Sequence, residues 1–338
     1  MSRTAEAEAA SAVKVAVLGA GQWGQNLVKT FAQLGALAAV VDPSPEIRKK
    51  VHADFPTVHV LESCEELLQL QAKEPEAQDI RAVVIATPAP THFALAREFL
   101  LAGMDVFLEK PMTLTVEDAV EVNRIAREQE AVLMVGHLLL YQPAIQFIKS
   151  FLERGELGPL QSLHQKRLKL GRVRQNEDVL WSFGAHDLAV LHHLVGNSPQ
   201  TITASGQCVL QPEAAIADDV HVHLGFAGGV HAHLHVSWLW PVQERRLMVA
   251  GTRGMLEYDE QTQTVTWHRK GVREDLSTWE EASEVVFQGD TAPLRLECQH
   301  FLDCVQHRQT PLSDGESAEQ VVRVLQQAAQ RMKEGVVR

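Results

Sequence analysis

The chain has 338 residues, of which 45% are hydrophobic and 22% are charged, and its formal net charge is −12. A chain of this length buries a large core and usually forms two domains. The acidic balance argues against a nucleic-acid partner, which requires a basic face, and no apolar run is long enough to predict a membrane span.

Residues 1–12 are small, polar and acidic, and they lack the basic start and apolar middle of a signal peptide. We expect a disordered tail there and a cytoplasmic protein. The four cysteines are expected to be free thiols of a reducing compartment, because their spacing does not indicate a metal site.

An apolar segment of strand length, 13–18, leads directly into a G-x-G-x-x-G turn and a helical pattern. Gly19 permits the tight turn, Gly21 lets a pyrophosphate approach the backbone, and Gly24 lets the helix pack close to the strand. Asp42 ends the next strand, where its carboxylate can bind both ribose hydroxyls and repel a 2′-phosphate. This pattern predicts a dinucleotide site that prefers NAD to NADP, the alternative being a glycine turn in an unrelated α/β protein.

Strand and helix patterns then alternate to about residue 136. Expected strands cover 37–41, 58–60, 82–86, 105–108 and 132–135. Unbroken apolar runs such as 82–86 are typical of parallel strands that are buried on both faces. We predict a doubly wound parallel sheet whose ligand crevice lies at the carboxyl ends of its strands.

After His137 strand-like segments dominate. They extend from 160 to 290, for example over 160–170, 200–209, 219–226, 230–238, 245–250 and 255–258, and helices are expected over 142–153, 184–195, 292–308 and 315–335. We predict an α/β protein with a Rossmann domain over 13–137. An α+β domain over 138–338, with a large and mostly antiparallel sheet, would bind substrate and mediate oligomerisation.

Glu109-Lys110-Pro111 follows a predicted strand, at the edge where the nicotinamide should lie. The Lys110 ammonium can donate hydrogen bonds to a substrate hydroxyl, unless it is only a surface lysine. His186 lies in the first turn of a predicted helix, and its ordinary pKa of about 6.5 suits a general base. We predict that His186 takes the hydroxyl proton while Lys110 polarises the hydroxyl; alternatively, His186 caps the helix or fills the core.

Arginines cluster on or just after the strand 160–170, and in an acidic protein this indicates either an anionic ligand or a solvated sheet edge. The predicted substrate-binding residues are Arg167, Arg172, Arg174, Trp181 and Asp187.

Histidines alternate along two strands that a hairpin would place side by side: His221, His223, His231, His233 and His235. The alternatives are a transition-metal site and a half-polar sheet face of the kind that a subunit interface can cover. Because no carboxylate or cysteine completes a ligand set, we expect no metal.

Several motifs together resemble the glucose-fructose oxidoreductase/inositol dehydrogenase (Gfo/Idh/MocA) family over residues 13–335. These motifs are GAGQWG, ATPAPTH, EKP, the HDL helix and PLRLECQHFLDCV. The resemblance implies that Lys110 and His186 are catalytic. Many members carry an aspartate four residues before the histidine; Ser182 stands there in this chain, so an aspartate-assisted proton relay is not carried over. The expected NAD site comprises Gly19, Gly21, Gln22, Trp23, Gly24, Asp42, Thr87, Pro88, His92, Glu109, Lys110 and His137.

The stretches GHLLLYQPA, RLKLGRVR and LWSFGAHDL are similar to a bacterial branch that oxidises the 3-hydroxyl of a UDP-N-acetylhexosamine or its uronate. The resemblance implies hydride transfer between such a sugar and NAD, in a homodimer or homotetramer formed through the second sheet. The alternatives are an inositol or free-sugar dehydrogenase and a non-catalytic NAD(H) sensor.

Overall fold

The computed structural model describes residues 13–74, 78–290 and 292–334. The expected tail, 1–12, lies outside these residues. The chain forms two compact units: the first contains the chain up to Gly136 together with Leu294–Ala318, and the second contains His137–Pro293 and the chain from Glu319. Within the described part of the chain, no helix is both long and apolar enough to cross a bilayer.

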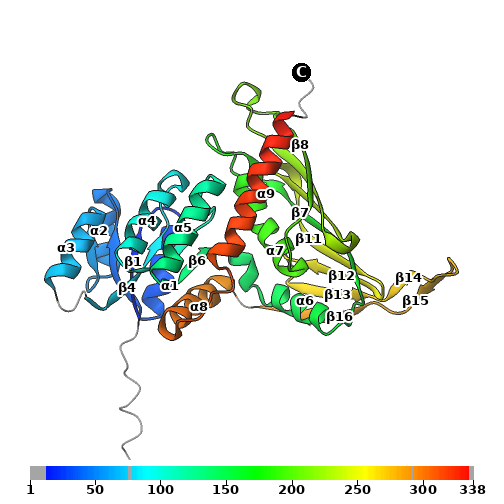
Figure 1. The fold of residues 1–338 in the computed structure, drawn as a ribbon, viewed down its shortest axis with the longest axis horizontal. Helices are drawn as coiled ribbons and strands as arrows, with labels where there is room; N and C mark the ends of the chain where they lie inside the picture. The colour runs from blue at the N-terminus through cyan, green and yellow to red at the C-terminus, as the bar shows by residue number, and fades with distance from the viewer. Residues whose placement is uncertain (1–12, 75–77, 291, 335–338) are drawn as a thin grey trace, which may run out of the picture. The chain divides into compact units, whose positions relative to one another are not determined.

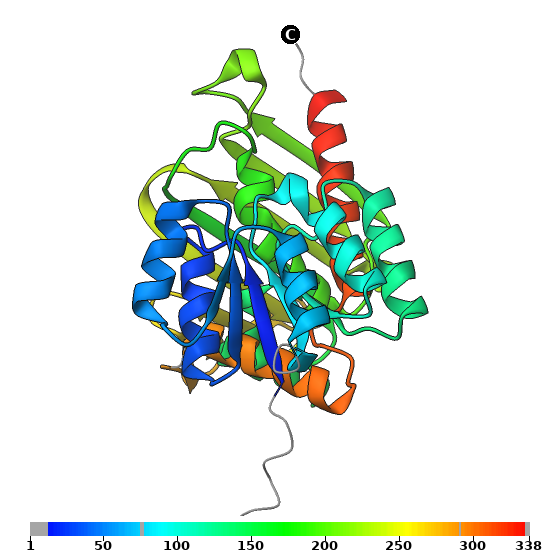
Figure 2. The same ribbon diagram turned by 90° about the vertical axis from the view of Figure 1, so that its left-hand side faces the viewer.

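The first unit is built on six parallel strands in the order β3-β2-β1-β4-β5-β6, and Figure 2 shows helices on both sides of them. The strands are β1 (Lys14–Leu18), β2 (Leu37–Val41), β3 (His59–Leu61), β4 (Ile80–Ile85), β5 (Asp105–Glu109) and β6 (Leu133–Gly136). The helices are α1 (Gly24–Gln33), α2 (Pro45–Asp54), α3 (Cys64–Lys73), α4 (His92–Leu101), α5 (Val116–Glu128) and α8 (Pro293–His307). The predicted doubly wound sheet is confirmed.

Local chemistry explains several of these boundaries. The Ser44 hydroxyl accepts a hydrogen bond from the backbone N–H of Ile47 at the start of α2, and Thr115 does the same for Asp118 at the start of α5. The apolar run of β4 is buried from Ala82 to Ile85 because helices cover both faces of the sheet.

Helix α8 belongs to the first unit, although the predicted second domain, 138–338, includes it. The reason is an aromatic contact across the sequence: Phe301 of α8 packs edge-on against Phe107 of β5, with ring centroids 5.5 Å apart. The backbone N–H of Val135 also donates to the Ser313 carbonyl at 2.8 Å. A local pattern predicts this helix but does not reveal which core it covers.

The second unit is built on eight strands in the order β16-β13-β12-β11-β7-β10-β9-β8. All neighbouring pairs are antiparallel except β10 and β7. The strands are β7 (Leu160–Leu170), β8 (Thr201–Gln207), β9 (Asp219–Gly225), β10 (His231–Ser237), β11 (Leu239–Gly251), β12 (Gly254–Asp259), β13 (Thr264–His268) and β16 (Glu284–Gln288), beside a small hairpin of β14 (Lys270–Val272) and β15 (Thr278–Glu280). The predicted, mostly antiparallel sheet is confirmed, and β13 to β16 lie within the region 160–290 where strand-like segments were expected.

One face of this sheet is covered by helices. These are α6 (Pro143–Glu153), α7 (Ala185–Val195) and α9 (Gly315–Glu334), which Figure 1 shows on the same side of the sheet. Leu234 of β10 points to this side, because it lies beside Gly184 at the start of α7. The residues next to it in the strand, His233 and His235, therefore point to the opposite face.

Candidate active site

The turn after β1 has the geometry that a dinucleotide requires. Gly19 has a φ of +87°, and a Cβ on Gly24 would lie 2.0 Å from the Gly19 carbonyl oxygen. A Cβ on Gly21 would meet no protein atom within 4 Å. The protein therefore leaves open the space in front of Gly21, beside the N-terminus of α1, where a pyrophosphate binds to free N–H groups.

Asp42 lies directly after β2 and is almost completely buried. Its Oδ2 accepts a hydrogen bond from the backbone N–H of Ala20 at 2.8 Å, and its Oδ1 accepts one from Ser44 at 2.9 Å. The carboxylate thus joins the glycine turn to the end of β2. Each oxygen keeps a further lone pair that can accept a ribose hydroxyl, so the residues present fit NAD.

His92 connects the loops that follow β4 and β5. Its Nδ1 lies 2.8 Å from the Pro111 carbonyl oxygen, and its Nε2 lies 2.9 Å from the Thr87 carbonyl oxygen. A carbonyl oxygen only accepts, so the ring donates to both when protonated and to one when neutral. Burial lowers the pKa of His92, which favours the neutral ring. These contacts within one unit bring His92 together with Thr87 and the loop of Lys110. Pro88 is exposed in the same loop as Thr87.

Trp23 and Glu109 form a contact that the sequence did not reveal. The indole Nε1 of Trp23 donates to Glu109 Oε1 at 2.5 Å, across 86 positions of the chain. Burial raises the pKa of Glu109 to about 7, although the hydrogen bond from Trp23 and the charge of Lys110 act in the opposite direction. A second buried carboxyl, Glu297 of α8, has its pKa raised by burial and by Glu109.

We expect the folded protein to lose stability between about pH 4.5 and 7 through Glu109. The folded state keeps this proton up to about pH 7, whereas the unfolded chain releases it near 4.5, so unfolding becomes easier as the pH rises. The side chain of Glu109→Gln does not titrate, although its amide oxygen can still accept from Trp23. The decrease in the free energy of unfolding with rising pH should therefore be smaller by roughly 3 kcal/mol in this variant than in the wild type. Urea unfolding of both proteins at pH 5 and pH 8 measures the difference, and identical changes in the two proteins would contradict the assignment.

His186 lies in the first turn of α7 and is half-buried. A π-helical turn, Leu180–Gly184, leads directly into α7, and Trp181 lies within it. Such wide turns occur often at functional sites. The sequence predicted the helix but not this turn. His137, the remaining candidate, is buried directly after β6.

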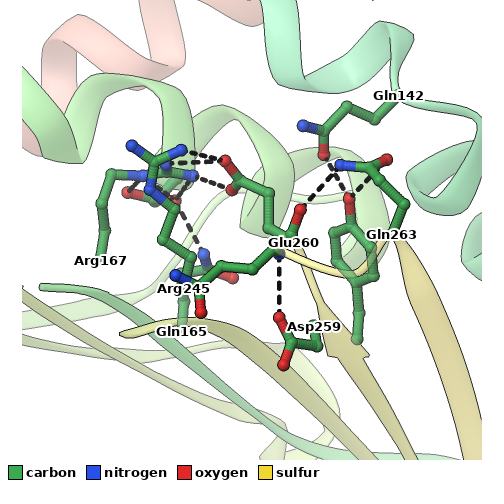
Figure 3. A network of polar contacts seen from close by, with 10 residues as sticks. Gln142, Gln165, Arg167, Arg245, Asp259, Glu260 and Gln263 are labelled. Atoms are coloured by element: carbon green, nitrogen blue, oxygen red, sulfur yellow. Dashed lines mark hydrogen bonds and ion pairs between the residues drawn. The ribbon is translucent and has the colours of Figure 1, made fainter. Parts of the chain in front are cut away.

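Figure 3 shows that Arg167 belongs to a buried network of charges. Its Nε lies 2.8 Å from Asp187 Oδ2, and its Nη2 lies 2.7 Å from Glu260 Oε2. Arg245 joins through Glu260 at 2.8 Å, and Gln165 donates to Asp187. Burial alone would lower the pKa of Arg167, but the two carboxylates raise it. Arg167 and Asp187, predicted to bind substrate, are here partners of each other and hold the first turn of α7.

Asp187→Asn should therefore lower the free energy of unfolding by about 3–5 kcal/mol, because it leaves the buried Arg167 with one carboxylate where it had two. Asp259→Asn is the matched control: Asp259 is partly exposed and lies 3.7 Å from Arg246, so its loss should cost no more than about 1 kcal/mol. Urea unfolding followed by circular dichroism compares the two. Equal costs would mean that the network does not stabilise the unit.

Arg172 and Arg174 differ from Arg167 because they are exposed in the loop after β7. The Arg174 Nε lies 3.5 Å from Glu177, and its carbonyl accepts a hydrogen bond from Gln211. They are the two predicted substrate arginines that remain accessible to an anionic group.

Comparison with known proteins agrees with this geometry. A model of an oxidoreductase family with an NAD-binding Rossmann fold matches residues 13–137, and a model of the GFO/IDH/MocA C-terminal domain matches residues 145–257.

UDP-N-acetylglucosamine 3-dehydrogenase from Acidithiobacillus ferrooxidans is 29% identical over 211 residues, an alignment that spans 61% of this chain and 61% of that relative. A solved structure of this enzyme has a TM-score of 0.82 with 26% identity, covering 95% of this chain and 98% of the other. Inositol 2-dehydrogenase from Rhizobium meliloti is 26% identical over 260 residues, 74% of this chain and 76% of that relative.

Proposed function

The chain belongs to the Gfo/Idh/MocA oxidoreductase family, and from this premise we propose that it is an NAD-dependent dehydrogenase that oxidises a secondary hydroxyl of a sugar. The observation that carries the proposal is the hydrogen bond from Trp23 to Glu109. It joins the dinucleotide turn to the segment that bears Lys110, so a hydroxyl bound near Lys110 lies beside the cofactor site.

In the proposed reaction each of these residues has a separate role. Bound NAD supplies the hydride acceptor. The Nζ of Lys110 donates a hydrogen bond to the substrate oxygen and stabilises the negative charge that develops there. A ring nitrogen of His186 takes the hydroxyl proton. The ion pair of Asp187 with Arg167 holds the turn of α7 from which His186 projects.

The substrate we propose is a UDP-N-acetylhexosamine or its uronate, oxidised at its 3-hydroxyl. The similarity to the Acidithiobacillus ferrooxidans enzyme supports this class, as do the exposed guanidinium groups of Arg172 and Arg174, which suit a diphosphate. An inositol is the second candidate, supported by the Rhizobium meliloti relative. A cytoplasmic location, and a homodimer or homotetramer formed through the eight-stranded sheet, are part of the proposal.

A substrate panel tests the proposal. The purified chain is mixed with NAD⁺ and, in turn, with UDP-N-acetylhexosamines, their uronates, inositols and free sugars, and the absorbance of reduced nicotinamide is followed. We expect UDP-sugars to give the highest kcat/KM, and Arg172→Ala with Arg174→Ala to raise the KM for UDP-sugars only. A preference for an inositol would favour the second candidate. NADH binding without turnover of any sugar would favour the sensor.

A further inference from the structure

The face of the eight-stranded sheet opposite α6, α7 and α9 carries a group of histidines. His221 and His223 of β9 lie opposite His235 and His233 of β10 in the antiparallel register, and His164 of β7 lies beside His233. The hollow in front of them has a volume of about 410 Å³ and is lined by residues of β7, β8, β9 and β10. The proposed dehydrogenase chemistry uses none of these residues.

A carboxylate completes one part of this group, contrary to the expectation from the sequence. Asp219 alternates in β9 with His221, so both point to the same face. One Asp219 oxygen lies 3.1 Å from His235 Nε2 and 3.6 Å from His221 Nε2, and the three possible ligand atoms all lie within 4.8 Å of one another. We propose that Asp219, His221 and His235 bind a divalent transition-metal ion such as Zn²⁺.

The two distances from Asp219 are close to those of tetrahedral coordination. Metal–ligand bonds of about 2.0–2.1 Å place neighbouring ligand atoms roughly 3.4 Å apart, between the separations of 3.1 Å to His235 and 3.6 Å to His221. Asp219 and His235 are largely buried and define the position of the ion. In the single chain the His221 side chain is 61% exposed, and its ring stacks on that of His235 with centroids 3.8 Å apart. Three protein ligands leave one position for water or an anion.

The chemistry of the ligands selects the class of ion. Two imidazoles and one carboxylate suit Zn²⁺, Co²⁺ or Ni²⁺, whereas Mg²⁺ and Ca²⁺ prefer oxygen ligands alone. A metal also requires neutral imidazoles. Lys166 lies beside His235 in the register, but its ammonium is bound by Glu244 at 3.1 Å.

The other histidines of this face form a different arrangement. His223 contacts His233 through its Nδ1 at 3.2 Å and His231 through its Nε2 at 3.1 Å. The two contacts use opposite sides of one ring, so no single point faces all three side chains. His223 therefore provides a matched control on the same sheet face.

The test uses the full chain without a histidine tag, after treatment with a chelator. Calorimetric titration with Zn²⁺ should show about one equivalent per chain, and Co²⁺ should give the visible absorption of a tetrahedral site. His235→Ala and the isosteric Asp219→Asn should each weaken binding at least about 100-fold, because changes outside the ligand set already cost 10–100-fold. His223→Ala and His52→Ala, the latter on the exposed surface of α2, should leave the affinity unchanged.

Three results would overturn the proposal. These are the absence of Zn²⁺ binding by the wild-type chain, an unchanged affinity in Asp219→Asn, and a loss in His223→Ala as large as that in His235→Ala. The Asp219→Asn protein keeps the shape of the side chain, so its result is informative even if His235→Ala does not fold.

Discussion

Lys110→Met lowers kcat for the preferred sugar by about 10²–10³-fold, because the variant no longer donates a hydrogen bond to the charge that develops on the substrate oxygen. The Kd for NADH should rise by a much smaller factor than kcat falls, since Asp42 and the glycine turn remain intact. Steady-state kinetics and NADH fluorescence measure the two quantities. Lys73→Met, in the last turn of α3, is the control and should retain wild-type activity.

His186→Ala should lower kcat by about 10²–10⁴-fold, the usual contribution of a positioned general base. If His186 and Lys110 act on one hydroxyl, the kcat of the double variant should be little lower than that of the slower single variant. The effects of substituting residues that act as a unit are not additive. Losses that multiply would show that the two side chains act independently. This comparison tests whether Lys110 and His186 serve the same reacting atom.

Gly21→Ala weakens NADH binding by roughly 10–100-fold while the free energy of unfolding stays unchanged. The added methyl group meets no protein atom, but it occupies the space in front of the backbone N–H groups. Losing one hydrogen bond to a charged phosphate costs about 1.5–3 kcal/mol, which corresponds to that change in affinity.

Gly24→Ala is the contrasting variant for this prediction. Its Cβ would lie 2.0 Å from the Gly19 carbonyl oxygen, so the turn has to move and stability falls together with NADH affinity. Calorimetric titration and urea unfolding separate the two effects. An unchanged NADH affinity in Gly21→Ala would mean that the pyrophosphate does not bind at this turn.

The parallel sheet could be predicted from the sequence because its signals are local. Apolar runs, the spacing of Gly19 to Gly24 and the capping residue Thr115 lie within a few residues of the elements that they define. Strand β11 was predicted too short, since Trp240 and Val242 in its first half are exposed and do not follow a core pattern.

Contacts between distant residues were the part that the sequence did not reveal. Arg167 donates hydrogen bonds to Asp187 and Glu260, which lie 20 and 93 positions away in the sequence. Nothing in the local pattern distinguishes it from an arginine that binds a ligand. The hydrogen bond between Trp23 and Glu109 is hidden for the same reason.

Asp219 is different, because its signal was present in the sequence. It alternates with His221 and His223 along one predicted strand, which is enough to place a carboxylate on the histidine face. The expectation that no carboxylate completes the ligand set overlooked Asp219, which lies two positions before His221.

The most direct test of the proposed reaction follows the hydrogen itself. The purified chain is mixed with NAD⁺ and UDP-N-acetylglucosamine that carries deuterium on carbon 3, the position named for the Acidithiobacillus ferrooxidans relative. Mass spectrometry should find the deuterium in the reduced nicotinamide and a 3-keto sugar as the product. Reduced nicotinamide without deuterium, or a bound cofactor that stays oxidised, would contradict the account.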